Sequence, residues 1–200
     1  MTQTIEINTA EQPLIEILSL FPEQGEWTEE DYFRLPETNR IVELSGGRLI
    51  ITPSPTEKHQ RISLNLLLLI AAYVRSHKSG EIRYSPLNVR LWQDTIRQPD
   101  IVFMSNEHKD RIAETCWGVP DLVMEILSES TSKEDRVTKF FEYLKAGILE
   151  YWIVDPFKGT IEVFTLENGA YVTFGRWRIG EIAKSKLLDG FEVSVDETML

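Results

Sequence analysis

The sequence predicts an α/β fold in which a mixed central β-sheet is flanked by helices. Apolar runs of strand length recur along the chain, and two longer segments have helical periodicity. One of those helical segments lies between two strand-like runs, which is typical of a crossover connection. The chain has 200 residues, of which 42% are hydrophobic, so it suits one domain with a sizeable core. We expect residues 26–200 to form that single domain.

Residues 1–25 differ from the rest of the chain in charge and in pattern. They show no sustained hydrophobic period, so we expect a flexible, loosely docked acidic arm. Residues 1–37 carry nine acidic side chains, and Arg34 is their one basic side chain. The rest of the chain therefore carries a net charge of only −3 out of the total of −11. A near-neutral body can still hold a local basic rim around an acidic metal site. The charge therefore weakens the case for a nucleic-acid partner but does not exclude one.

Cysteine content and the apolar runs favour a cytoplasmic protein. Cys116 is the single cysteine, so the chain forms no internal disulfide and has no pair of cysteines at metal-ligand spacing. Residues 1–25 lack the basic segment and compact apolar core of a signal peptide. The longest apolar run, residues 66–74, is well short of the roughly 20 residues that cross a bilayer. We therefore expect no membrane partner.

Caps and turns define the first elements. Thr28 and Asp31 have the spacing of a capping box, which predicts a short helix that begins there and ends before the next proline. Residues 41–44 and 48–52 are strand-like runs joined by residues 45–47, Ser-Gly-Gly, a composition typical of a hairpin turn. A helix followed by a β-hairpin is therefore expected at the start of the domain.

A long helix is expected next. Ser54 can be its N-cap, Pro55 its first residue and Glu57 its capping-box acid. The helical pattern continues to about His77, and Gly80 is the predicted terminator.

The second half of the chain contains six further strand-like runs and one more helix. Ser132 is the predicted N-cap of that helix, Asp135 lies at its third position, and Gly147 ends it. The helix lies between the third and fourth runs, so those two strands can be parallel within a mixed sheet. The six runs are residues 82–92, 100–104, 122–127, 151–154, 161–165 and 171–174.

Two acidic residues on different strand-like runs are candidate metal ligands. Side chains alternate along a strand, so Glu125 shares a largely apolar face, where an unpaired carboxylate would cost several kcal/mol. Asp121 lies roughly 13 Å away along the same strand, too far to share a cation held at about 2.1 Å by each ligand. Asp100, directly after Pro99, can lie across from Glu125 with about 5 Å between the Cβ atoms if the strands are neighbours. The predicted metal ligands are therefore Asp100 and Glu125.

A lysine can reach this pair from the second helix. Asp135, Lys139 and Tyr143 recur every four residues and lie on one helix face, and a helix that crosses back over the sheet can deliver Lys139 to the metal. The alternative is a surface ion pair between Asp135 and Lys139, worth about 0.3 to 0.5 kcal/mol. The packing face consists of Val137, Phe140, Phe141 and Leu144.

Glu43 and His59 each have two interpretations. Glu43 is one strand position away from its apolar neighbours, so it is either exposed to solvent or part of a site. His59 is in line with Ile62, Leu66 and Ile70 on the first long helix and so points toward the core. It is either a satisfied core histidine or a group that orients or transfers a proton beside Glu43 or a metal-bound water.

These motifs resemble a known nuclease signature and, in their order along the chain, a known protein family. The proline, the aspartate after it and the second acid resemble the PD-(D/E)XK nuclease signature, although Leu127 stands where that signature has its lysine. A wider set resembles the Uma family of restriction endonucleases over roughly residues 27–165. That set is Glu43-Leu44 before Gly46-Gly47, Pro53-Ser54-Pro55 with His59, Arg97-Gln98-Pro99-Asp100, Asp121-Leu122-Val123 with Glu125, Asp135 with Lys139 and Tyr143, and Glu150 to Pro156.

The resemblance implies a restriction-endonuclease-like fold in which the lysine has moved onto a helix. It implies that Asp100 and Glu125 bind Mg²⁺, with Mn²⁺ as a substitute, and that Lys139 stabilises developing charge or orients water. Glu43 and His59 would complete the catalytic pocket. The implied substrate is nucleic acid, in the first place DNA, and the apolar C-terminal runs together with the family imply a homodimer.

The alternative is a catalytically inactive protein that keeps the nuclease fold as a binding or regulatory module. Leu127 in the lysine position and the acidic arm motivate this hypothesis. Other hydrolase classes have little support, because the chain has neither a Gly-rich phosphate loop nor a Gly-x-Ser-x-Gly elbow.

Overall fold

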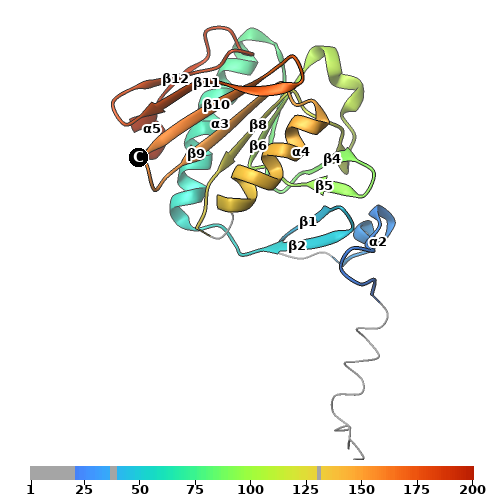
Figure 1. Cartoon of the computed structure of the whole chain (residues 1–200). Coiled ribbons are helices and arrows are strands. Elements are labelled where there is room, and N and C mark those ends of the chain that lie inside the picture. The colour runs from blue at the N-terminus through green and yellow to red at the C-terminus, as the bar shows by residue number, and fades with distance from the viewer. Residues whose placement is uncertain (1–20, 37–39, 130–131) are drawn as a thin grey trace, which may run out of the picture.

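A six-stranded mixed sheet forms the centre of the computed structural model, which describes residues 21–36, 40–129 and 132–200 (Figure 1). The strands are β1 (Ile41–Ser45), β2 (Arg48–Thr52), β3 (Gly80–Tyr84), β4 (Asn88–Trp92), β5 (Thr95–Arg97), β6 (Ile101–Ser105), β7 (Cys116–Trp117), β8 (Leu122–Ile126), β9 (Glu150–Asp155), β10 (Thr160–Glu167), β11 (Ala170–Arg178), β12 (Ile182–Lys184) and β13 (Glu192–Ser194). The central sheet has the order β11-β10-β9-β8-β6-β3, and a second sheet has the order β2-β1-β5-β4-β7.

Helices cover both faces of the central sheet. In Figure 1, α3 lies behind the sheet and α4 lies in front of it. The helical segments are α2 (Glu29–Phe33), α3 (Glu57–His77), a 3-10 helix η1 (Asn106–Arg111), a π-helical turn η2 (Glu134–Thr138), α4 (Lys139–Ala146) and α5 (Val195–Met199). None of the helices in the described ranges combines the length and apolarity needed to span a membrane.

Alternation along β8 explains why the helices lie on opposite faces. Every residue of β8 is buried, because the strand is central and both of its faces are covered. Its even-numbered residues pack with α3, and Val123 packs on the other face with Tyr143 of α4. The α3 side of the core contains Ile62, Leu66, Ile70 and Val74 from the helix and Leu122, Met124 and Ile126 from the strand.

The neighbours of β8 determine where the candidate acids lie. β8 runs parallel to β9 and is connected to it through η2 and α4, so the predicted crossover and mixed sheet are present. β6 runs antiparallel to β8, with Ile101 opposite Met124. One step further along this register, Asp100 lies opposite Glu125, as the sequence predicts.

The first predicted helix and the hairpin are confirmed. Thr28 caps α2, and the Thr28 and Asp31 side chains accept each other's backbone N–H groups. In the turn between β1 and β2, Gly46 and Gly47 have φ values of 54° and 74°, which a two-residue hairpin turn with the twist of its strands requires.

Three predicted helix boundaries and one strand are wrong in detail. Thr56, not Ser54, is the N-cap of α3, because its hydroxyl accepts the N–H of His59. The helix ends at His77 as predicted, but Lys78 in the left-handed conformation ends it. Gly80 instead begins β3, where an added Cβ would lie 2.0 Å from the carbonyl oxygen of Met104.

Ser132 is not an N-cap, and residues 82–92 do not form one strand. The N–H of Ser132 already donates to the carbonyl of Ser128 at 3.1 Å, a helical i to i−4 bond that the N–H of an N-cap residue does not make. The 82–92 run divides into β3 and β4 around Pro86, which has no N–H to donate to a strand neighbour.

The predicted acidic arm lies mostly outside the described residues, which begin at residue 21. Its last residues contact the β1–β2 hairpin. The N–H of Gly25 donates to the carbonyl of Gly47 at 2.8 Å, and the Gln24 side chain accepts the N–H of Leu49 at 2.9 Å.

Candidate active site

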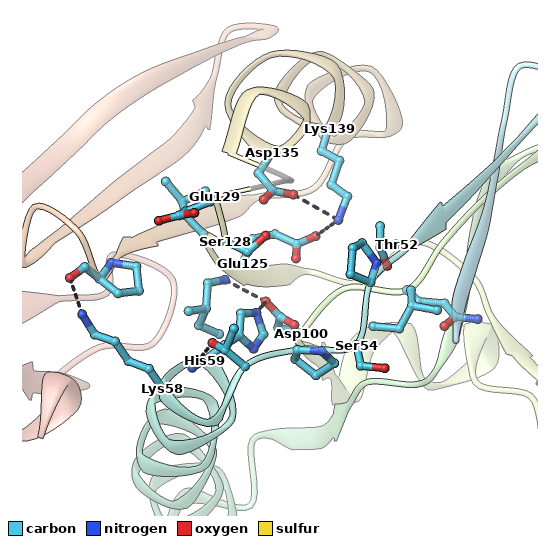
Figure 2. Close-up of a pocket in the computed structure, with 18 of the residues that line it drawn as sticks. Thr52, Ser54, Lys58, His59, Asp100, Glu125, Ser128, Glu129, Asp135 and Lys139 are labelled. Atoms are coloured by element: carbon cyan, nitrogen blue, oxygen red, sulfur yellow. Dashed lines mark hydrogen bonds and ion pairs between the residues drawn. The ribbon is translucent and has the colours of Figure 1, made fainter. Parts of the chain in front are cut away.

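A cavity of about 460 Å³ opens where β8 ends, β6 begins and α3 starts. All five site residues predicted from the sequence line it: Glu43, His59, Asp100, Glu125 and Lys139. Figure 2 shows Lys139 and Asp135 above Glu125 in this view, with Asp100 and His59 below it. The structure therefore brings the predicted residues together from both sheets and both long helices.

Lys139 points inward from α4. Its ammonium nitrogen lies 2.9 Å from Glu125 Oε1, 3.2 Å from Asp135 Oδ1 and 3.5 Å from Glu43 Oε1 (Figure 2). The side chain is 8% exposed, so the alternative of a surface ion pair with Asp135 is wrong. The π-helical turn η2 comes directly before Lys139, and such turns are frequent at functional sites.

Tyr143, one turn further along α4, holds the same carboxylate. Its hydroxyl donates to Glu125 Oε1 at 2.6 Å, and its side chain is fully buried. Both donors therefore act on Oε1, and no hydrogen bond or ion pair within the described ranges involves Oε2 of Glu125. Glu125 lines the cavity, and its Oε2 is not sealed off from solvent. This oxygen is therefore open to the cavity.

As in Glu125, one carboxylate oxygen of Asp100 has hydrogen-bonding partners and the other has none among the described residues. Its Oδ2 accepts the backbone N–H of Ile126 at 2.8 Å and lies 3.2 Å from Nε2 of His59. The bond to Ile126 attaches Asp100 to the residue after Glu125. Among the described residues none donates to Oδ1, which leaves one open oxygen on each of the two carboxylates.

Glu43 lies inside the protein, so the predicted alternative of solvent exposure is wrong. Its side chain is buried. Oε1 accepts the N–H of Gln98 at 2.8 Å, and Oε2 accepts from Arg97 at 3.0 Å. With both oxygens engaged, Glu43 fits the role of a positioning residue for Lys139 better than that of a metal ligand.

Arg97 belongs to a motif quoted from the sequence, but its role in the site was not predicted. It is fully buried at the end of β5 and also donates to Glu134 at 2.9 Å and Glu142 at 2.6 Å. Its guanidinium therefore ties β1, η2 and α4 to β5. The sequence shows only an arginine in the short run before Pro99. Spacing along the chain does not reveal that the three acidic partners of this arginine lie on other elements.

Burial and neighbouring charges shift the pKa values of the site. Burial raises the pKa of Glu125 to about 8, because the attraction of Lys139 offsets only part of the burial and Asp135 and Asp100 repel the charge. Burial alone would lower the pKa of Lys139, but Glu125, Glu43 and Asp135 raise it well above its ordinary value.

Glu43 and His59 are shifted toward their charged forms. Burial opposes the charge of Glu43, but Lys139 and Arg97 outweigh it and lower the pKa of this carboxyl. Burial likewise opposes the charge of His59, but its hydrogen bond to Asp100 raises the pKa of the imidazole. The imidazole is therefore paired with Asp100 and is not an isolated core residue.

The donor set fits a divalent cation held by two carboxylates. Across the described ranges, no three Asp, Glu, His or Cys side chains form a ready-made metal site. Mg²⁺, however, is commonly held by one or two carboxylates while waters and substrate phosphates complete its octahedron. The open oxygens of Asp100 and Glu125 match that arrangement, and the raised pKa of Glu125 indicates that the negative charge around it is not fully compensated.

Comparison with known proteins assigns the chain to a family. The family model Uma2, described as "Putative restriction endonuclease", matches residues 29–196. The chain belongs to the Uma2 family. This confirms the predicted family, and the matched span of this Uma2 protein contains all five predicted site residues.

A solved structure supports the fold of this Uma2 chain. The crystal structure of a putative nuclease belonging to DUF820 from Anabaena variabilis ATCC 29413 matches with a TM-score of 0.74 and 21% sequence identity. The match covers 86% of this chain and 97% of that chain, which confirms the predicted α/β nuclease-type fold. The curated proteins include no match.

Asp121 and Leu127 have structural roles in this Uma2 protein. Asp121, at the far end of β8, accepts the N–H of Ser105 and pairs with His108, each at 2.6 Å. Leu127, at the usual lysine position, is buried in the core with Tyr143. The ammonium group beside Glu125 comes from Lys139 instead.

Proposed function

We propose that this Uma2 protein is a metal-dependent endonuclease that hydrolyses phosphodiester bonds in nucleic acid, in the first place DNA. The observation that carries the proposal is the pair of open carboxylate oxygens, on Asp100 and Glu125, with the Lys139 ammonium 2.9 Å from the latter carboxylate. Mg²⁺, or Mn²⁺ in its place, fits these hard oxygen donors, and the backbone carbonyl near Ile126 is a further candidate ligand. Such a cation would polarise the phosphate and lower the pKa of the attacking water.

The surrounding residues position these groups. Lys139 is placed to orient the attacking water or to stabilise the charge that develops on the phosphate. Tyr143 orients Glu125 through its hydrogen bond to Oε1, and Glu43 contributes to the placement of Lys139. During hydrolysis the water oxygen bonds to phosphorus, the bond to the leaving oxygen breaks, and that oxygen gains a proton. His59, paired with Asp100, is a candidate for moving that proton.

The test is cleavage of DNA by the full chain with Mg²⁺ or Mn²⁺. Asp100→Asn and Glu125→Gln, which keep side-chain size, are expected to abolish cleavage. Glu114→Gln at an exposed position is the matched control and is expected to cleave like the wild type. Cleavage by the double variant Asp100→Asn/Glu125→Gln at the wild-type rate would disprove the assignment. Absence of both Mg²⁺ binding in calorimetry and nucleic-acid binding at low salt would favour the non-catalytic binding module.

Three further expectations, on domain extent, compartment and oligomeric state, accompany this proposal. We propose that residues 26–200 act as one domain and that the protein is cytoplasmic. We also propose a homodimer, for which the exposed apolar residues Val172 and Phe174 on the edge strand β11 are the candidate surface. Light scattering tests the dimer, and a monomeric mass at micromolar concentration would exclude it.

A further inference from the structure

The cavity at the candidate active site continues into a second one. That second cavity measures about 910 Å³. Asp100 and His59 line both cavities, so the two meet at a predicted metal ligand. The two cavities adjoin at the lining residues that they share, and together they are called the groove. The residues shared by its two parts are Ile41, Pro55, His59, Gln98 and Asp100.

Exposed aromatic side chains line the groove on both sides of the acid pair. Phe157 lines the first part and is 57% exposed, whereas Tyr84 and Phe33 line the second part and are 59% and 44% exposed. The groove therefore combines a buried acidic centre with exposed aromatic rings, and the Lys58 ammonium lies over the Phe157 ring, 5.8 Å from its centroid.

The strand order places these rings on opposite sides of the acids. β9, β8, β6 and β3 are neighbours in that order. Phe157 follows β9, Glu125 lies near the end of β8, Asp100 precedes β6 and Tyr84 ends β3. The registers Ile126 to Val154 and Tyr84 to Ile101 put all four positions at the same end of the sheet. With about 4.8 Å between neighbouring strands, the two aromatic positions are separated by roughly 14 Å, with the acids between them.

Exposed rings of this kind match the faces of unpaired bases. Stacking of a base on an aromatic side chain is tolerant of sequence, because every base has a π-face. In a duplex the bases are covered by their stacked and paired neighbours, so a protein ring reaches them mainly in single strands, loops and ends.

The charge of the groove also favours an unpaired strand over a duplex. Proteins that bind duplex DNA gain much of their affinity by neutralising phosphates with basic side chains. Over the described part of the chain, the basic residues that line the groove are Arg40, Lys58, His59 and Lys139. His59 and Lys139 pair with the acids, and Lys58 donates to the carbonyl of Pro156 at 2.9 Å. Stacking must therefore supply much of the affinity.

We propose that the groove binds a short unpaired strand of nucleic acid, with one base on Phe157, another on Tyr84, and the phosphodiester between them at Asp100 and Glu125. Cleavage of that strand rests on the proposed nuclease function, but its binding does not. The substrate class is thereby narrowed to single strands and unpaired ends. DNA and RNA share the chemistry that the rings recognise.

Binding by fluorescence anisotropy tests this directly. The protein is the full chain carrying Glu125→Gln, and the probes are labelled oligothymidylate, oligouridylate and a duplex of the same length. We expect at least one single strand to bind about 10-fold or more tightly than the duplex. Tyr84→Ala and Phe157→Ala should each weaken that binding by about 5- to 100-fold. Phe141→Ala, an exposed ring on α4 that lines neither part of the groove, is the matched control and should change the affinity less than about 2-fold.

Conservative variants separate stacking from simple apolar contact. Tyr84→Trp and Phe157→Trp should keep the affinity, whereas Tyr84→Leu and Phe157→Leu should lose it. Equal binding of duplex and single strands, unchanged affinity in the alanine variants, or full retention by the leucine variants would each overturn the proposal. Ring-dependent binding without cleavage by the wild type would leave the strand site in place and reject the nuclease function. Cleavage of duplex DNA that is unaffected by Phe157→Ala would support the nuclease function and reject the strand site.

Discussion

Ionisation of Glu125 is expected to destabilise the folded protein, so Glu125→Gln should stabilise it at alkaline pH. The carboxyl is 3% exposed, and burial raises its pKa to about 8, against 4.5 when it is exposed to water. Between these two values the folded state holds a proton that the unfolded state releases. The contribution of Glu125 to stability is therefore full below about pH 4.5, falls as the pH rises and is lowest above about pH 8.

The size of the effect follows from the same two values. Each pH unit between them corresponds to about 1.4 kcal/mol, so complete ionisation costs on the order of 5 kcal/mol of unfolding free energy. The glutamine has no charge to bury, and its carbonyl can still accept the Tyr143 hydroxyl. Lys139 keeps Asp135 at 3.2 Å and Glu43 at 3.5 Å, so its ammonium group remains paired.

Urea unfolding with EDTA present, from pH 5 to 8.5, measures this difference. We expect wild type and Glu125→Gln to have similar stability near pH 5 and the variant to be more stable by a few kcal/mol at pH 8.5. Glu114→Gln, at an exposed position, controls for the loss of one negative charge. A Glu125→Gln variant that is no more stable than the wild type at pH 8.5 would refute the reasoning.

Three further predictions concern the neighbours of Glu125. Arg97→Met leaves Glu43, Glu134 and Glu142 without their shared cation and should lower the unfolding free energy by about 3 to 5 kcal/mol in urea; a loss below about 1 kcal/mol would contradict the buried network. Tyr143→Phe removes one hydrogen bond to a carboxylate, worth about 1.5 to 3 kcal/mol, and should lower kcat about 10-fold with little change in KM; an unchanged kcat would deny Tyr143 a positioning role. Mg²⁺ at about 100 times its Kd should raise the unfolding free energy of the wild type by about 2.7 kcal/mol but not that of Asp100→Asn, and equal stabilisation of both would remove Asp100 from the metal site.

Periodicity predicted the parts of the site that depend on neighbouring residues along the chain. The rise per residue along the strand separated Glu125 from Asp121 by roughly 13 Å, and the four-residue spacing in the second helix grouped Lys139 with Asp135. The elements that were missed are short, such as β5 with three residues and β7 with two. A strand of two or three residues has too few positions for a hydrophobic period to be recognised.

The sequence by itself determined the fold class, because strand alternation and helix spacing are local properties of the backbone, and the order of its motifs indicated the family. Only the tertiary structure decided that the strands of Asp100 and Glu125 are neighbours, that Lys139 turns inward and that Arg97 joins three acids. Those contacts join residues 14 to 54 positions apart, and a side chain's burial is decided by what packs over it. The same holds for the groove, since Phe157 and Tyr84 come to flank the acids only through the order of the strands.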